Sequence, residues 1–278
     1  MVDETKKIMY KKANPRRQFL RQTLVAGAAT IGLPGILSAA AGSMVNAQPQ
    51  QNSEVQTPID DDKKITILFQ GDSITDGGRS KNNDWNHLMG SGYVYLLSSS
   101  LWYRFPGKNF QFVNRGVSGN KITDLAARWQ QDCIDIQPDV LSILVGVNDA
   151  NSVVDHRPGQ VDSAKFEAEY RALLQQAKEK LPGVKLILGE PFIFQLGRTE
   201  KNYTLWLDEI KKRQASVRIL AKEFDAILVD YQQAFDEALK RAPVNYWIWD
   251  GIHPMPAGHE LMARHWTKRV HKKLSFIK

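Results

Sequence analysis

The sequence has few of the features by which many functional classes are recognised. It contains a single cysteine, Cys133, so no disulfide can form within its 278 residues. It also has no cluster of metal-ligating residues, no glycine-rich phosphate loop and no dinucleotide fingerprint. We therefore expect neither a metal nor an organic cofactor. Cys133 follows Trp129 at four-residue spacing on a predicted amphipathic helix, which favours a small buried apolar residue.

Net charge is also small outside the N-terminal segment. The chain carries a formal net charge of +7, but residues 1–47 hold seven of the 37 Lys and Arg residues and two of the 30 Asp and Glu residues, which leaves +2 for the remainder. A nearly balanced charge offers no electrostatic footprint for nucleic acid or for an anionic membrane. We expect neither of these as a partner.

Residues 1–47 have the features of an export signal. Arg16 and Arg17 form a twin-arginine pair, followed by a mildly apolar stretch over residues 24–41 and a small-residue cleavage site at residues 45–47. Three glycines and a proline make the apolar stretch a poor membrane-spanning helix. The sequence thus predicts a twin-arginine (Tat) signal peptide read by the twin-arginine export machinery, no stable membrane insertion after cleavage, and a periplasmic or secreted protein. The lack of disulfides agrees, because such cargo folds before export.

The rest of the chain predicts one α/β domain. Residues 48–63 are polar and aperiodic and are typical of a flexible linker, and residues 64–278 form the predicted catalytic domain. Apolar runs predict five strands, at residues 65–69, 110–114, 140–145, 185–189 and 226–230. Helical patterns follow the strands, at residues 93–105, 123–135, 166–181, 210–224, 231–241 and from 256 onward. This alternation predicts a parallel sheet with helices on both faces.

Ser73 is the first candidate for chemistry. It lies two residues after Gly71, where the first predicted strand stops, in a turn rich in Asp, Thr and Gly. In open α/β sheets, ligands bind outside the carboxyl ends of the strands. Ser73 is therefore well placed to be a nucleophile, whereas an isolated Asp-Ser pair would more commonly cap a helix.

A candidate base for this serine lies near the C-terminus. Asp250 and His253 are three residues apart with Gly251 between them, so a tight turn can bring the carboxylate onto the imidazole. Pro254 favours an extended conformation for His253 and keeps it out of the following helix. A carboxylate on one imidazole nitrogen leaves the other free to act as a base towards Ser73.

An ester-cleaving serine also needs donors aimed at the developing oxyanion. Three candidates follow successive strands: the backbone N–H of Ser73, the backbone N–H of Gly119 and the side-chain amide of Asn148. A glycine lets the backbone approach a ligand closely, and an asparagine supplies an N–H without a charge. Each alone is typical of an ordinary turn, but their joint occurrence favours an oxyanion hole.

Four further residues are candidates for substrate binding. Trp85, Trp247 and Trp249 lie near the predicted catalytic positions, where their indole faces could stack on sugar rings. His87 forms a second Asp-x-x-His pattern with Asp84, on a long loop without a following proline, which we interpret as the rim of the substrate pocket. Core packing of the tryptophans and a plain surface position of His87 are the alternatives.

These motifs together resemble the four sequence blocks of the SGNH, or GDSL-type, hydrolase family. The matching segments occur in the family's order: Gly-Asp-Ser-Ile at 71–74, Gly119, Gly-Val-Asn-Asp at 146–149 and Asp-Gly-Ile-His at 250–253. Ile74 stands where the name-giving motif has leucine, a volume-conserving exchange. The pentapeptide Gly-x-Ser-x-Gly of the α/β-hydrolase fold does not occur, so we set that fold aside.

The resemblance implies a flavodoxin-like three-layer α/β/α sandwich with a central five-stranded parallel sheet. It also implies a catalytic triad of Ser73, His253 and Asp250, and an oxyanion hole formed by Ser73, Gly119 and Asn148. The family contains carbohydrate acetylesterases, lipases, lysophospholipases and thioesterases, so the fold alone does not select the substrate.

We expect a serine esterase that removes small acyl groups, acetyl in particular, from carbohydrate. The tryptophans near the site favour this function, and no long apolar loop is present that would form an acyl-chain tunnel or a lid. Two alternatives stay open: a lysophospholipase or thioesterase acting on lipid acyl esters, and a sugar-binding module without catalysis.

Overall fold

The computed structural model describes residues 64–82 and 84–277. The predicted signal peptide, its cleavage site and the linker fall on residues 1–63, which lie outside the described residues. Those three expectations therefore stay predictions.

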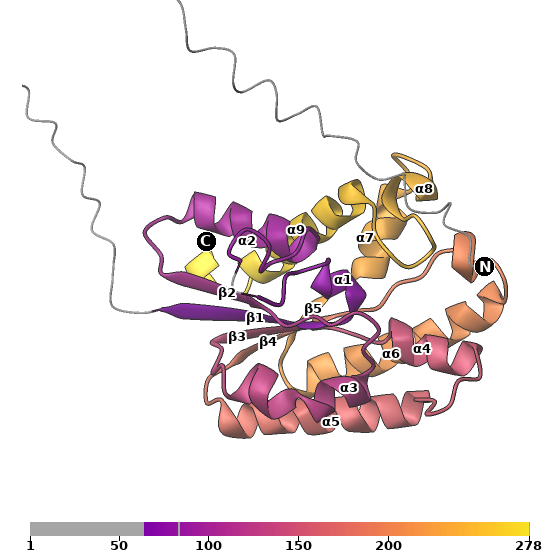
Figure 1. Cartoon of the computed structure of the whole chain (residues 1–278), viewed down its shortest axis with the longest axis horizontal. Coiled ribbons are helices and arrows are strands. Elements are labelled where there is room, and N and C mark those ends of the chain that lie inside the picture. Colours follow the sequence, from indigo (N-terminus) through magenta and orange to yellow (C-terminus); the bar gives the residue numbers. More distant parts are fainter. Residues whose placement is uncertain (1–63, 83, 278) are drawn as a thin grey trace, which may run out of the picture. The chain divides into compact units, whose positions relative to one another are not determined.

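The centre of the domain is a five-stranded parallel sheet (Figure 1). Its strands are β1 (Ile65–Gly71), β2 (Phe110–Asn114), β3 (Val140–Leu144), β4 (Lys185–Gly189) and β5 (Ile227–Val229). They are arranged in the order β2-β1-β3-β4-β5, and every neighbouring pair is parallel. This is the flavodoxin-like order, in which the crevice at the carboxyl ends of β1 and β3 is the expected ligand site. The predicted sheet is confirmed.

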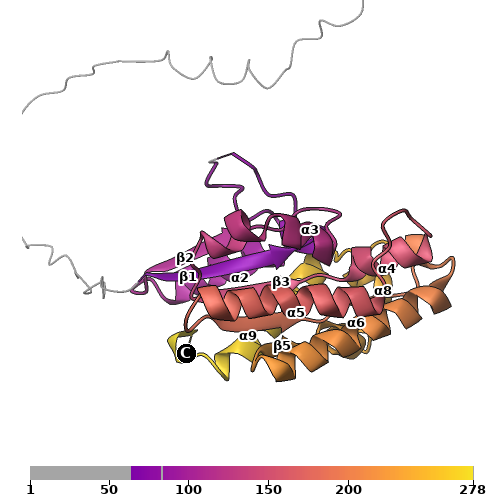
Figure 2. The ribbon, with the colours of Figure 1, turned by 90° about the horizontal axis from the view of Figure 1, so that it is seen from below.

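Helices cover both faces of the sheet (Figures 1 and 2). On one face lie α2 (Tyr93–Arg104), α7 (Tyr231–Ala238) and α9 (Pro256–His271), and on the other lie α3 (Ile122–Ala127), α5 (Ser163–Lys180) and α6 (Tyr203–Glu223). Successive residues of a strand point to opposite faces. Ile67 and Phe69 of β1 accordingly enter one apolar core, and Leu68 enters the other. The central residues of the strand, 67–69, are all apolar because both faces of the strand are buried.

One local prediction was wrong, and one helix was not predicted. The helix predicted over residues 123–135 is divided into α3 and a π-helix, η3 (Gln130–Ile134), in which the Asp135 backbone amide donates to the Gln130 carbonyl, five residues back, at 2.9 Å. Asn148 lies in the first turn of α4 (Val147–Val154), a helix that the sequence patterns did not predict and that buries Val147, Ala150 and Val154. Asn and Asp near a helix start resemble turn residues in sequence.

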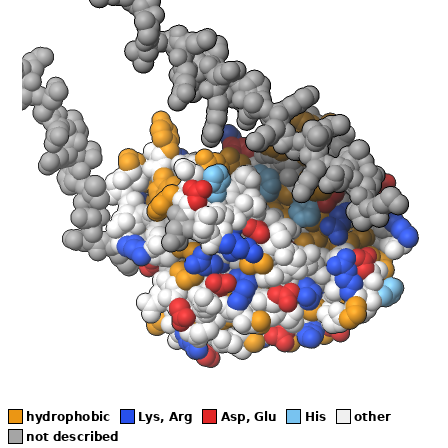
Figure 3. Space-filling view, in the orientation of Figure 1, with side chains coloured by type: hydrophobic (Ala, Val, Ile, Leu, Met, Phe, Trp, Pro, Cys, Tyr) orange, Lys and Arg blue, Asp and Glu red, His pale blue; other side chains and the backbone are white. Residues whose placement is uncertain are grey.

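The length and apolarity of the described helices show whether any of them could span a membrane. None of the helices within residues 64–82 and 84–277 is both long enough and apolar enough to cross a bilayer. On the face shown in Figure 3, acidic and basic side chains are interspersed, in keeping with the small net charge of this part of the chain.

Candidate active site

Ser73, His253 and Asp250 meet at the carboxyl edge of the sheet although they are far apart in sequence. Ser73 is the first residue of a short helix, α1 (Ser73–Asp76), that follows β1 directly. His253 and Asp250 lie in the loop between α8 (Val244–Trp247) and α9. Ser73 Oγ is 2.8 Å from His253 Nε2, and His253 Nδ1 is 2.8 Å from Asp250 Oδ2. The three side chains thus form one hydrogen-bonded series.

A tight turn holds the Asp–His pair, as the spacing predicted. Asp250 Oδ1 accepts hydrogen bonds from the backbone amides of Ile252, at 3.0 Å, and His253, at 2.7 Å. Gly251 has φ +90°, and a Cβ there would collide with the Thr199 hydroxyl, so only glycine fits this turn. The carboxylate is therefore fixed in position before any ligand arrives.

The same hydrogen bonds keep Asp250 ionised. Burial acts to raise the pKa of its carboxyl, but the bonds from the His253 side chain and from the two backbone amides outweigh burial and leave the pKa below its usual value. An ionised Asp250 orients the imidazole and can stabilise its protonated form.

The three candidate oxyanion donors face the same edge. Ser73 begins α1, so its N–H is not used by the helix's own bonding. Gly119 has φ +86°, and no atom of the described residues lies within 4 Å of the place a Cβ would take, so its backbone borders open space. The Asn148 side-chain amide donates to the Asn120 carbonyl at 3.1 Å and so lies against the loop that carries Gly119.

Side chains that the sequence reasoning did not assign hold this loop. Asp76, at the end of α1, accepts hydrogen bonds from the Ser118 backbone amide at 3.1 Å and from the Ser118 hydroxyl at 3.0 Å. Arg128 Nε donates to Asn120 Oδ1 at 2.9 Å. The only sequence signal for these roles was proximity to a motif residue, which does not identify a partner.

Two buried carboxyls adjoin the site, each next to a candidate donor. Asp72 precedes Ser73 and caps α1 by accepting from the Ile74 amide at 3.0 Å, and burial raises the pKa of Asp72 to about 7. Asp149 follows Asn148 and accepts from the Ile122 amide at 3.0 Å, and burial raises the pKa of Asp149 to about 6.

A second histidine, His259 on α9, is held neutral near the site. Its Nδ1 accepts a hydrogen bond from the Tyr93 backbone amide at 3.1 Å. Burial, and to a lesser extent the nearby charge of His253, lower the pKa of His259 to about 4. At neutral pH it is therefore an uncharged acceptor that joins α9 to α2.

The structure separates the residues expected to bind substrate. Trp249 is 60% exposed and stacks on the His253 ring, with 5.8 Å between centroids and 27° between planes. Trp85 is 72% exposed, and His87 pairs with Asp84 at 2.7 Å on the same exposed loop. Trp247 is only 5% exposed and packs in the core, so the expectation that it faces substrate is corrected.

The reason for the position of Trp247 is the short helix α8, which ends at this residue. The Trp247 indole N–H donates to the Ala242 carbonyl at 3.2 Å, and the Arg241 guanidinium lies over the Trp247 ring. Core packing was the alternative interpretation of this tryptophan, and the burial supports it.

A serine, a histidine and an aspartate in hydrogen-bonded series, at the carboxyl edge of a flavodoxin-like sheet, are the arrangement of a serine-type hydrolase. Comparison with known proteins is more specific. Residues 69–261 match the model of the GDSL-like lipase/acylhydrolase family, and the chain belongs to this family. The resemblance found in the motifs is confirmed, and the protein is a carboxylic ester hydrolase.

Its relatives include proteins named as esterases and lipases. The chain is 34% identical to an acetylxylan esterase of Geobacillus stearothermophilus over 209 residues, covering 73% of this chain and 93% of that one. A crystal structure of an acetylxylan esterase from the same organism matches with a TM-score of 0.66 at 32% identity, covering 74% of this chain and 94% of that one. A putative GDSL-like lipase of Parabacteroides merdae matches with a TM-score of 0.71 at 41% identity, covering 76% and 97%.

Proposed function

We propose that the protein is a serine esterase that removes small acyl groups, acetyl in particular, from carbohydrate. The observation that carries the proposal is the continuous series from Ser73 Oγ through His253 to Asp250, with both links at 2.8 Å. The acetylxylan esterase relative supports the choice of acyl group and alcohol. Catalytic mutants of the Geobacillus esterase have a serine or an aspartate replaced by alanine, which agrees with roles for these residue types.

The proposed reaction has two half-steps that use the same base. His253 Nε2 takes the proton of Ser73 Oγ as that oxygen attacks the acetyl carbonyl carbon, and it returns the proton to the sugar oxygen as the ester C–O bond breaks. Water then attacks the acyl-serine, with His253 again taking and returning one proton, and acetate leaves. Asp250 stays ionised throughout and stabilises the imidazolium.

The negative charge on the carbonyl oxygen needs donors in both half-steps. In this proposal the Ser73 and Gly119 amides and the Asn148 side chain supply them. Their N–H groups are held before the substrate arrives, since Asn148 lies in a helix and Ser118 is tied to Asp76. Donors fixed in advance avoid a reorganisation cost as the charge develops.

Trp249 supports a sugar as the alcohol. Its exposed indole lies directly beside His253, where the leaving alcohol would be protonated. An aromatic face in this place can stack on a pyranose ring. A lipid ester is the second candidate function, favoured by the name of the putative lipase relative at 41% identity.

Two measurements test the proposal. Acetate release from acetylated xylan and pectin is measured beside kcat/KM for aryl esters of two to twelve acyl carbons. We expect acetate release and a rate that falls with chain length, because a short acyl pocket cannot bury added methylenes. A rate that rises with chain length, without acetate from either polysaccharide, would instead establish the lipid function.

The assigned roles are tested by Ser73→Ala, His253→Ala and the double variant. Each single change should remove nearly all activity, and the double variant should be scarcely worse, because residues acting as a unit are strongly non-additive. Ser100→Ala, on the exposed surface of α2, is the matched control and should keep wild-type turnover. Turnover retained by Ser73→Ala would refute the nucleophile.

A further inference from the structure

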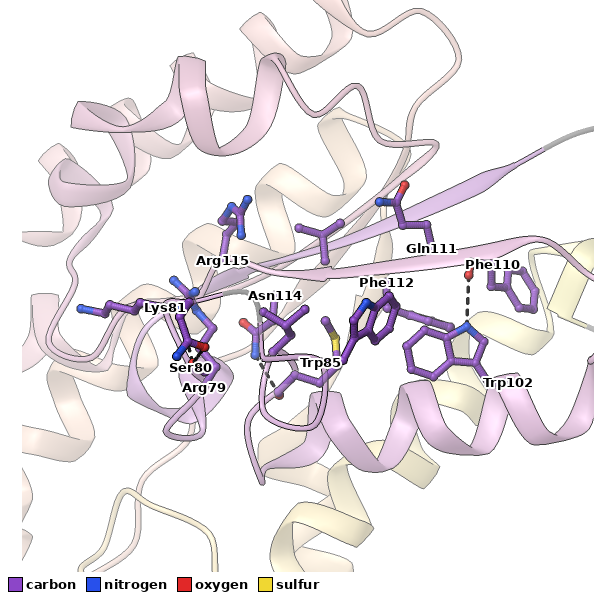
Figure 4. A pocket seen from close by; sticks show the side chains of 14 residues that line it. Arg79, Ser80, Lys81, Trp85, Trp102, Phe110, Gln111, Phe112, Asn114 and Arg115 are labelled. Atoms are coloured by element: carbon purple, nitrogen blue, oxygen red, sulfur yellow. Dashed lines mark hydrogen bonds between the residues drawn. The ribbon is translucent and has the colours of Figure 1, made fainter.

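A groove of about 510 Å³ runs along the edge strand β2, beside the residues that join β1 to α2. Figure 4 shows its two ends: basic side chains gather at the carboxyl end of β2, and large aromatic rings lie towards the start of the strand. The side chains that matter here are Arg79, Lys81, Trp85, Trp102, Phe112 and Arg115. None of them belongs to the Ser–His–Asp series.

The aromatic end is a braced platform. Trp102 donates from its indole nitrogen to the Phe110 carbonyl at 3.1 Å, and its ring meets Phe112 edge-on, with 4.9 Å between centroids and 86° between planes. The exposed ring of Trp85 lies 6.1 Å from the ring of Trp102. The two indole planes are inclined by 49°, so the exposed face of Trp85 is the surface on which a sugar ring can stack, with the anchored Trp102 beside it.

The other end carries an excess of positive charge. Arg79, Lys81 and Arg115 line the groove, and none of the described lining residues has a carboxylate. Arg79 is paired with Asp76 at 3.9 Å. Asp132 is shared between Arg115, at 3.4 Å, and Arg128, at 2.9 Å. Two carboxylates thus face four basic side chains, Lys81 included, and a positive excess remains. The groove therefore attracts an anion at this end.

Hydrogen bonds connect the basic end to the reactive serine. Arg79 Nε donates to the Gly116 carbonyl at 2.9 Å, in the loop that continues to Gly119. The Arg79 backbone amide donates to the Asp76 carbonyl at 3.0 Å, and Asp76 closes the single-turn helix that Ser73 opens. The basic end of the groove is thus joined to Ser73 through α1, and to Gly119 through the loop that follows β2.

We propose that this groove binds a carboxylate-bearing sugar unit, a uronic acid, of the esterified chain. The inference rests on the proposed function and makes it more specific, because it assigns the class of polysaccharide. A sugar ring of the chain would stack on Trp85 beside Trp102, and the carboxylate of the uronic acid would lie further along the chain, facing Lys81 at the basic end of the groove. A neutral sugar would stack on the Trp85 indole but make no ion pair at the basic end. The proposed site is therefore expected to bind acidic chains more tightly than neutral ones.

The test measures binding without chemistry. Calorimetric titration of the Ser73→Ala protein compares three ester-free ligands: a glucuronic acid-substituted xylo-oligosaccharide, an oligogalacturonide and a neutral xylo-oligosaccharide of equal length. At low ionic strength we expect at least one acidic ligand to bind about tenfold more tightly than the neutral one, with the difference shrinking in 0.5 M salt. The acidic ligand that binds more tightly identifies the source of the carboxylate.

Variants locate the effect in the groove. Lys81→Glu should weaken binding of the acidic ligand about tenfold and leave the neutral ligand unchanged, while Lys211→Glu, an equal charge change on the exposed side of α6, should alter both by less than twofold. Trp85→Ala should weaken acidic and neutral ligands alike, by about two- to tenfold. Tyr103→Ala removes an aromatic ring that is 88% exposed and lies outside the groove, and it should have no effect.

Two results would overturn the proposal: equal affinity of the Ser73→Ala protein for acidic and neutral ligands, or an acidic preference that Lys81→Glu leaves intact. A failure of the proposed esterase function can be distinguished from a failure of the proposed binding site, because the two are measured by different assays. Wild-type hydrolysis of a small aryl acetate requires Ser73 but not the groove, and ester-free binding requires the groove but not Ser73.

Discussion

Asp72 is a buried carboxyl directly before the proposed nucleophile, and its charge state couples folding to pH. Burial raises its pKa from 3.8 to about 7. Between these values the folded chain keeps a proton that the unfolded chain has lost, so the unfolded state binds fewer protons and stability falls as the pH rises. Above pH 7 the folded protein must hold an unfavourable buried charge at this position.

We expect Asp72→Asn to be more stable than the wild type at pH 8. Asparagine can still cap α1 but carries no charge, and one pKa unit corresponds to about 1.4 kcal/mol, so the gain can reach about 4 kcal/mol. At pH 4 the two proteins should differ little. Urea unfolding at both pH values measures the free energies.

Asp162→Asn is the matched control, because Asp162 caps α5 in the same way at the exposed surface. It should show no such gain at pH 8. If the difference in free energy of unfolding between Asp72→Asn and the wild type is the same at pH 4 and pH 8, the pKa of Asp72 is not raised.

His259 acts on stability in the opposite direction. Its pKa is lowered from 6.5 to about 4, first by burial and then by the charge of His253. Between these values the unfolded chain takes up a proton that the folded chain does not, so stability falls as the pH drops. The wild-type profile sums both effects, and the difference between Asp72→Asn and the wild type isolates the carboxyl.

Asn148 is predicted to act on the transition state more than on substrate binding. Asn148→Ala should lower kcat by about 10²–10³-fold, as the loss of one oxyanion donor does elsewhere, with a much smaller change in KM. Steady-state kinetics on an aryl acetate gives both constants. Circular dichroism would show that α4 is retained. A change confined to KM would assign Asn148 to substrate binding instead.

At the scale of elements, Trp266 is the largest of the side chains that pack α9 against the sheet. Trp266 is fully buried, donates from its indole nitrogen to the Ser142 hydroxyl on β3 at 3.0 Å, and lies 5.8 Å from the ring of Phe69 on β1. The helix begins three residues after His253, so its docking also positions the proposed base.

Trp266→Phe should lower the free energy of unfolding by about 1–3 kcal/mol, through a small cavity and the lost hydrogen bond. Ser142→Ala should cost about 1 kcal/mol in the wild type and close to nothing in the Trp266→Phe background, because the two residues share one bond. Urea unfolding of the four proteins measures this coupling. Fully additive losses would show that the hydrogen bond contributes nothing to the docking of α9.

At the scale of the whole molecule, we propose that residues 1–47 direct the folded enzyme through the twin-arginine machinery. Arg16→Lys with Arg17→Lys should leave the precursor in the cytoplasm, and the exported wild-type protein should begin near Gln48. Cell fractionation and N-terminal sequencing measure both.

The control for export changes Lys11 and Lys12 to Arg, which keeps the charge outside the arginine pair. That precursor should be exported normally. Unimpaired export of the Arg16→Lys, Arg17→Lys precursor would indicate a general secretory signal.

The features that could be predicted from the amino-acid sequence are those that depend on neighbouring residues. The five strands were predictable because each is a short, mainly apolar run and helical patterns separate one run from the next, an alternation that a doubly covered parallel sheet accommodates. The turn that joins Asp250 to His253 was predictable for the same reason, since a glycine, a proline and a three-residue spacing restrict the backbone locally.

Which of these side chains are buried, and what they contact, depends on how the elements pack together in three dimensions. Trp247 and Trp249 are residues of the same type, two positions apart. Trp247 nevertheless packs in the core, whereas Trp249 is exposed beside His253. The raised pKa of Asp72 and the groove beside β2 arise in the same way, from elements that lie far apart in the chain. Burial is set by distant segments that pack together, and no local pattern records which segments those are.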